Sequence, residues 1–159
     1  MKRIVSLSFC LLLAMTAAGA DLATKKALTL EVAKQIAAAA AAEALKNQWT
    51  VVIAIVDDGG HLIYLERIDD TQVGSVDIAQ AKAQCAVKFK RPTKALEDVL
   101  VGGRQAILAL PGAVPVEGGL PILADGKLIG AIGVSGVTSQ QDGLIAKAGL
   151  DALPKILGR

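Results

Sequence analysis

Histidine, cysteine and tyrosine, the usual nucleophiles and transition-metal ligands, are scarce in this chain of 159 residues. There is one histidine, His61, one tyrosine, Tyr64, and a pair of cysteines, Cys10 and Cys85. A structural zinc ion needs about four protein ligands, usually Cys and His, and this set is too small to supply them. No Gly-x-Ser-x-Gly segment accompanies the histidine, so the sequence does not indicate a serine hydrolase.

Two other patterns suggest ligand binding at first sight. Residues 130–136 read GAIGVSG, but the glycines lie in a predicted strand, and no Lys-Ser/Thr pair follows as in a phosphate-binding loop. The pairs Asp57-Asp58 and Asp69-Asp70 could hold a cation through carboxylate oxygens, although acidic turns are usually solvated. Motifs alone therefore assign no reaction.

Lys82 departs from the pattern of its surroundings. A helix is predicted from about Ser75 to Lys90, and at 100° per residue Lys82 lies beside Ile78 and Cys85 on an apolar side. Such a break often marks function, and the ammonium could then bind an anionic ligand. The favoured interpretation is that the stem packs while the ammonium reaches solvent or pairs with a carboxylate, since buried lysines are usually paired.

The first 20 residues have the features of a secretory signal peptide. Lys2 and Arg3 precede an apolar run over residues 4–17, and Ala18-Gly19-Ala20 offers small residues at a cleavage point. The run is shorter than the roughly 20 residues that a membrane anchor needs. We therefore expect a periplasmic or secreted protein, without a membrane association after cleavage. Loss of Cys10 would leave one cysteine, so no intramolecular disulfide is expected.

Composition predicts that residues 21–159 form a single domain. Hydrophobic residues make up 53% of the chain and charged residues 20%, with a net charge of +2. This balance suits a packed core and lacks the basic face of a nucleic-acid-binding protein. High apolar content with Ala- and Gly-rich faces predicts a homo-oligomer.

The order of the expected elements predicts the fold class. Helices are expected at residues 30–46, 75–90, 93–101, 104–109 and 139–153, and strands at 50–56, 61–67, 122–124 and 128–135. Thr29, Thr93 and Ser139 are the expected N-caps of the helices that follow them. Without βαβ alternation, the order predicts an α+β protein with an antiparallel sheet flanked by helices.

One face of the last strand carries almost no side-chain bulk. Its residues are Ala131, Gly133 and Ser135. Something must approach this backbone closely, either a packed helix or another subunit or ligand.

Ordered short motifs along essentially the whole of residues 21–159 resemble the haem-binding GlcG/HbpS-like family, which is related to the C-terminal domain of PduO-type cobalamin adenosyltransferases. The matching segments are Asp57-Asp58-Gly59-Gly60-His61-Leu62, Arg67-x-Asp69, Ala81-Lys82-Ala83, Phe89-Lys90-Arg91-Pro92-Thr93, Leu110-Pro111-Gly112, Glu117-Gly118-Gly119-Leu120-Pro121-Ile122, residues 129–136 and Gln141-Asp142. The resemblance implies a profilin-like, three-layer α/β/α fold, oligomers, and haem as the partner, with cobalamin or iron as the weaker alternatives. No axial residue is carried over from the family.

On that resemblance, a haem site can be assembled from candidate residues. Phe89 could stack on the porphyrin, Arg91 or Lys82 could neutralise the propionates, and Thr93 could offer an oxygen to the iron or a bound water.

Haem iron usually takes His, Cys, Met or Tyr as its axial ligand, which restricts the candidates to His61, Cys85 and Tyr64.

Two further functions stay open. One is a small enzyme acting on a tetrapyrrole or small organic acid, with Lys82 as base or anion anchor. The other is a non-catalytic assembly or sensory partner protein.

Overall fold

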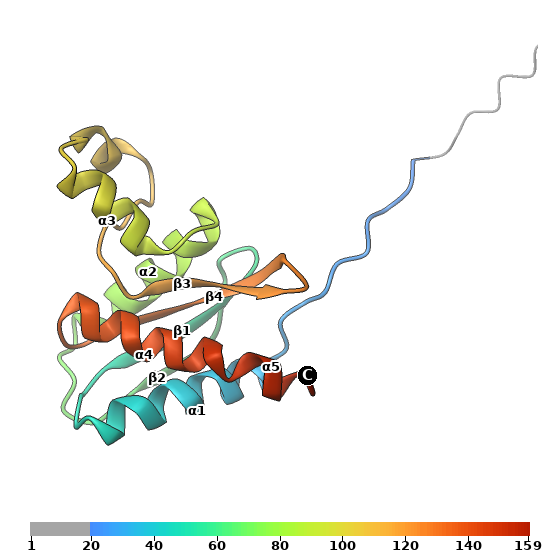
Figure 1. Cartoon of the computed structure of the whole chain (residues 1–159), viewed down its shortest axis with the longest axis horizontal. Helices are drawn as coiled ribbons and strands as arrows, with labels where there is room; N and C mark the ends of the chain where they lie inside the picture. The colour runs from blue at the N-terminus through green and yellow to red at the C-terminus, as the bar shows by residue number, and fades with distance from the viewer. Residues whose placement is uncertain (1–19) are drawn as a thin grey trace, which may run out of the picture.

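The computed structural model describes residues 20–159, so the predicted signal peptide lies outside the described residues except for Ala20. The elements are α1 (Leu30–Lys46), β1 (Val52–Asp57), β2 (Leu62–Arg67), α2 (Ser75–Phe89), α3 (Thr93–Val101), the 3₁₀ helix η1 (Gln105–Ala109), β3 (Gly119–Ala124), β4 (Lys127–Ser135), α4 (Ser139–Asp151) and α5 (Leu153–Ile156) (Figure 1).

The four strands form one antiparallel sheet in the order β2-β1-β4-β3. β1 lies in the interior of the sheet, as its nearly continuous apolar sequence predicts, and residues 52–56 are all buried. Because Asp57 pairs with Gly130, the β1–β2 and β3–β4 turns lie at the same end of the sheet. The predicted antiparallel sheet flanked by helices is confirmed.

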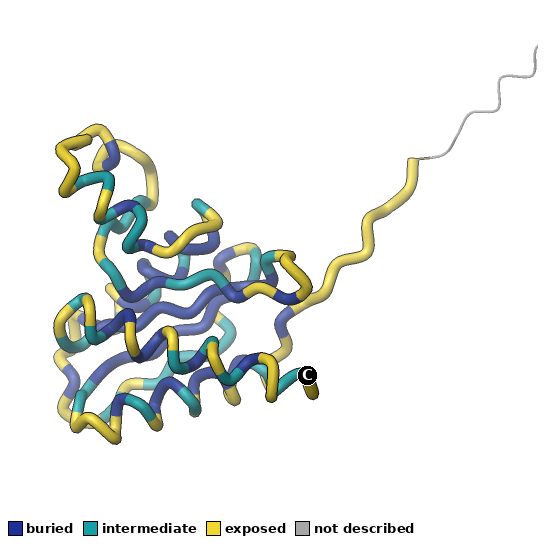
Figure 2. The backbone as a smooth tube through the Cα atoms, in the orientation of Figure 1, coloured by how far each residue is buried: buried dark blue, intermediate teal, exposed yellow. Residues whose placement is uncertain are grey.

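Helices cover both faces of the sheet, which gives three layers. α1 and α4 pack together on one face, where Ile53, Ile55 and Ile132 form the main core with them. α1 carries a buried face rich in alanine, and Ala40 lies against Gly149 of α4, where an added Cβ would come within 3.2 Å of the Ala40 Cβ. Figure 2 shows the buried stretches of this helix. α2 covers the opposite face.

The bare face of β4 is filled by α2. A Cβ atom built on Gly133 would lie 2.0 Å from the carbonyl oxygen of Ala79 and 2.6 Å from the nitrogen of Ala83. Of the three partners that the sequence left open for this face, the packed helix is therefore the one present.

Residues 93–118, which we call the arm, project from the layers and contain α3 and η1 (Figure 1). Three hydrogen bonds hold the ends of the arm against its neighbours. The Gly119 N–H donates to Thr93 Oγ1 at 2.9 Å, the Val114 N–H donates to Cys85 Sγ at 3.2 Å, and the Val134 N–H donates to the Gly118 carbonyl oxygen at 2.9 Å.

Of the three expected N-caps, Thr29 is confirmed, because its hydroxyl accepts from the Val32 N–H at the start of α1, and the other two are wrong. Thr138 caps α4 in a capping box, because its hydroxyl accepts from the Gln141 N–H while the Gln141 side chain accepts from the Thr138 N–H. Pro92 precedes α3, and the Thr93 hydroxyl is used by Gly119 instead. The last helix also divides at Ala152 into α4 and α5.

Within residues 20–159, no helix is both long and apolar enough to cross a membrane. The same residues contain no group of three or more His, Cys, Asp or Glu side chains placed to hold a metal ion.

We predict that Gly133→Ala lowers the free energy of unfolding by about 3 kcal/mol, because the added methyl group forces α2 away from β4. Gly74→Ala is the matched control, since a Cβ there has no heavy atom within 4 Å. Urea unfolding of both variants measures the difference, and equal stability would contradict the close packing of α2.

Candidate ligand-binding site

Lys82 forms a buried ion pair with a residue of α4. Its ammonium donates to Asp142 Oδ2 at 2.8 Å and to the Val134 carbonyl oxygen at 3.0 Å. Both side chains are almost completely buried, at 2% and 3% exposure. Of the two interpretations of Lys82, pairing with a carboxylate is therefore the one present in the structure.

Two opposing effects act on the carboxyl group of this pair. Burial raises the pKa of Asp142, while the hydrogen bond from the Lys82 ammonium and the N–H of Val137 stabilise the ionised form. Because the Lys82 charge is already neutralised inside the protein, this residue is poorly suited to anchor an anionic ligand. It lines none of the described cavities.

We predict that Lys82→Met lowers the free energy of unfolding by about 3 kcal/mol, because Asp142 becomes an unpaired buried carboxylate. The double variant Lys82→Met/Asp142→Leu should regain much of this loss, since no buried charge remains. Denaturant unfolding of both single variants and the double variant measures the coupling. Additive effects would contradict the pairing.

A cavity of about 300 Å³ lies between the end of α2 and the arm, and we call it the α2–arm pocket. Its lining residues are Phe89, Arg91, Leu96, Val99, Arg104, Ala106, Ile107 and Leu110. Six of the eight are apolar, and Leu96 and Ile107 belong to a buried cluster with Cys85. The pocket therefore combines an apolar wall with two guanidinium groups.

The charge of this pocket is entirely positive. No acidic side chain lines it, and neither arginine forms a salt bridge with a carboxylate of residues 20–159. Arg91 Nε donates to the Phe89 carbonyl oxygen at 3.1 Å, which orients that guanidinium at the end of α2. Such a site favours an apolar ligand that carries two negative charges.

The structure brings together two of the five site residues expected from the sequence. Phe89 and Arg91 line the α2–arm pocket. Thr93 lies below the surface with its hydroxyl bonded to Gly119, and Lys82 is paired internally. His61 is exposed in the β1–β2 turn and lies outside this pocket.

Arg104 is the charged lining residue that sequence reasoning missed. No motif marks it, and it lies 13 positions after Arg91 in a segment of irregular sequence. The arm, by folding back from α3 into η1, brings it to the same cavity. Only the tertiary structure reveals the arginine pair.

The other two candidates for the axial iron ligand, Cys85 and Tyr64, form hydrogen bonds within the fold. Burial raises the pKa of the Cys85 thiol, and its sulfur accepts a hydrogen bond from Val114. The Tyr64 hydroxyl donates to Glu66 at 3.0 Å, a bond that raises the pKa of the phenol. Neither residue lines the α2–arm pocket.

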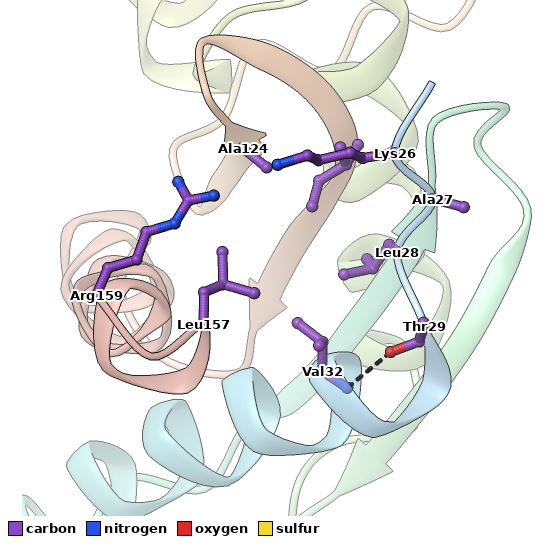
Figure 3. A pocket seen from close by; sticks show the side chains of 9 residues that line it. Lys26, Ala27, Leu28, Thr29, Val32, Ala124, Leu157 and Arg159 are labelled. Carbon is purple, nitrogen blue, oxygen red and sulfur yellow. Dashed lines mark hydrogen bonds between the residues drawn. The ribbon is translucent and has the colours of Figure 1, made fainter. Parts of the chain in front are cut away.

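A smaller cavity of about 150 Å³ lies between the N-terminal segment, α5 and the end of β3 (Figure 3). Leu28, Val32 and Leu157 form part of its apolar wall. Lys26 and Arg159 also line it, but both are ion-paired with Asp125, whose pKa they hold well below its usual range. Its two cations thus share one carboxylate, whereas neither arginine of the α2–arm pocket has a carboxylate partner among residues 20–159.

The fold and this site can be compared with known proteins. A family model described as "Haem degrading protein HbpS-like" matches residues 28–151. The chain belongs to the HbpS-like family. The resemblance expected from the sequence motifs is confirmed.

Two relatives in this HbpS-like family illustrate the degree of similarity. Protein GlcG of Escherichia coli strain K12 is 45% identical over 112 residues, which cover 70% of this chain and 84% of GlcG. The crystal structure of a double mutant of Streptomyces reticuli HbpS superposes with a TM-score of 0.78 at 34% identity, over 86% of this chain and 94% of HbpS.

A third HbpS-like relative was crystallised with a ligand. The structure described as a PduOC–haem complex superposes with a TM-score of 0.73 at 33% identity. The match covers 80% of this chain and 95% of that one.

Proposed function

We propose that this protein is an exported, homo-oligomeric haem-binding protein whose haem lies in the α2–arm pocket. The observation that carries the proposal is the presence of two arginines, Arg91 and Arg104, in the lining of a pocket that is otherwise apolar. Haem is a flat apolar ring with two propionate groups, so its chemistry complements this combination.

The lining residues of the pocket are of the types that suit the propionates and the ring of haem. A guanidinium binds a carboxylate through two parallel hydrogen bonds, which suits one propionate for each arginine. Phe89 offers an aromatic ring for the porphyrin. When bound, haem would supply an iron centre, and the residues of the pocket would hold its organic part and exclude water from one side.

The volume of the pocket indicates that it would enclose only part of a haem molecule. A volume of about 300 Å³ is at the lower end of ligand pockets, so part of the haem would extend beyond the arm. Val101 and Leu108 on the arm are 81% and 61% exposed. Exposed apolar side chains of this kind support assembly with further copies of the chain.

The relatives support the choice of ligand. A related domain was crystallised as a complex with haem, and the family model carries the description "Haem degrading protein HbpS-like". An enzyme that uses Lys82 as base or anion anchor is less well supported, because that ammonium is buried, is bound to Asp142 and lines none of the described cavities.

Titration of the protein without residues 1–20 with haemin tests the proposal. We expect a shifted Soret band, and Arg91→Ala or Arg104→Ala should each weaken binding at least about tenfold, because each removes a charge-assisted hydrogen bond worth about 1.5 kcal/mol or more. Arg67→Ala, on the exposed part of β2, is the matched control and should bind as the wild type does.

Cobalamin and buffer titrations serve as ligand controls. Absence of a Soret shift in the wild type would refute haem binding. Equal affinity in the arginine variants would place haem outside the α2–arm pocket.

Export has a separate test. We predict that protein recovered from the extracytoplasmic fraction begins near Asp21, because small residues precede that position. Intact-mass measurement determines the new N-terminus. Retention of residues 1–20 in a soluble cytoplasmic product would contradict the prediction.

A further inference from the structure

The cavity beside α5, which we call the α5 cavity, is separate from the α2–arm pocket (Figure 3). It is bounded by residues 26–29, the first turn of α1, the β3–β4 hairpin and the segment that follows α5. No residue lines both this cavity and the α2–arm pocket. The α5 cavity is therefore a second candidate site, which the proposed haem binding does not use.

The interior of the α5 cavity is apolar. Its wall includes buried or half-buried apolar side chains: Leu28, Val32, Ala124, Ile129 and Leu157. Among residues 20–159, no buried side-chain nitrogen or oxygen lacks a hydrogen-bond partner, so the wall offers no such group to water. An apolar cavity of about 150 Å³ stays dry and can bind benzene. The α5 cavity, at about 150 Å³, thus has the size and polarity for a benzene-sized apolar group.

The rim of the α5 cavity is positively charged. Lys26 and Arg159 are 59% and 48% exposed, and they extend toward one another from opposite sides of the cavity (Figure 3). Both bind the Asp125 carboxylate. Lys127 lines a neighbouring cavity together with Lys26 and Asp125, and it forms no ion pair within the part of the chain that the structure describes. Three cations therefore surround one side-chain carboxylate.

Asp125 uses only part of the hydrogen-bonding capacity of its two partners. It accepts from Nη1 and Nη2 of Arg159 and from the Lys26 ammonium. A guanidinium carries five N–H groups and an ammonium carries three, so both cations retain donors for a second carboxylate. Hydrogen bonds between such cations and a carboxylate are among the strong ones. The rim is thus suited to an anion, and the interior to an apolar group.

The β3–β4 turn fixes the position of Asp125. Ala124 pairs with Lys127, which leaves Asp125 and Gly126 as the two turn residues, and their φ angles are 51° and 73°. A two-residue hairpin turn of this kind needs positive φ at both positions, and asparagine accepts it as readily as aspartate does. The carboxylate can therefore be replaced by an amide without loss of the turn.

We propose that the α5 cavity binds a small carboxylate whose apolar tail is about as large as benzene, with the tail inside and the carboxylate between Lys26 and Arg159. Benzoate and hexanoate represent the aromatic and aliphatic forms of this ligand class. Asp125 competes with the ligand for the same two cations, so it limits the affinity of the site.

Titration of the protein with benzoate, followed by amide NMR, tests the proposal. We expect saturable shifts of the Val32, Ala124 and Leu157 signals, and the same response to hexanoate. Acetate has the charge without the tail, and benzyl alcohol has the ring without the charge. Each should bind at least about tenfold more weakly than benzoate, because each lacks one half of the interaction. Equal binding of either control ligand would overturn the proposal.

Three variants separate the rim from the interior. Arg159→Ala should weaken benzoate binding at least about tenfold, whereas Lys34→Ala, on the exposed side of α1, is the matched control and should bind as the wild type does. Asp125→Asn should strengthen binding about tenfold, because the competing carboxylate is gone. Val32→Phe should abolish binding, because the larger side chain fills the cavity. An otherwise unchanged amide spectrum shows that this last variant is folded.

The variants also decide against the proposal if it is wrong. Wild-type affinity in Val32→Phe would place the carboxylate outside the cavity. An affinity of Asp125→Asn equal to or below that of the wild type would show that Asp125 does not compete for the ligand position. Haemin titration is independent of these results: if the wild type binds benzoate but no haem, the proposed function fails and the α5 site stands.

Discussion

The buried ion pair between Lys82 and Asp142 connects the helical layers on the two sides of the sheet. Lys82 belongs to α2 and Asp142 to α4, and the ammonium also binds the Val134 carbonyl oxygen in β4. Gly118 closes over the pair, since a Cβ there would lie 2.8 Å from Lys82 Nζ. Breaking the pair would leave a charge in a place that water does not reach, which is a strong constraint on the position of α2.

The position of α2 in turn determines where a ligand can bind. Close contact between Gly133 and the backbone of Ala79 and Ala83 sets the depth of α2 on β4. Its last turn then presents Phe89 beside the arm, whose apolar residues pack on Cys85. Arg91 and Arg104 face the same cavity for this reason, although they come from different segments. The pocket is thus a consequence of how α2 is held.

The sequence predicts most of the fold because its patterns are local. The apolar run of β1, the Gly/Asp turns and the bare face of β4 each have a direct physical meaning, and the structure agrees with them. Helix caps were less predictable: Thr138 and Ser139 are both good capping residues, and the hydrogen bond with Gln141 decides between them. Thr93 is also a good capping residue by type, but its hydroxyl accepts from Gly119, 26 residues away, and the local sequence carries no sign of that partner.

The site was less predictable for the same reason. Phe89 and Arg91 stand in a recognisable motif, whereas Arg104 joins them only through the path of the arm. Lys82 was correctly identified as unusual, but its partner lies 60 residues away, so the sequence could not show whether that partner is internal or a ligand. Long-range pairing of charges is the information that local patterns lack.

The central claim is that haem binds between the end of α2 and the arm. Paramagnetic broadening of amide NMR signals by ferric haem locates the iron without relying on any variant. The account predicts strong broadening for residues of the pocket such as Leu96, Val99 and Ile107, with little change for Ala40 in the core beneath the opposite face. Broadening centred on Leu28 and Leu157 instead, at the cavity beside α5, would contradict it.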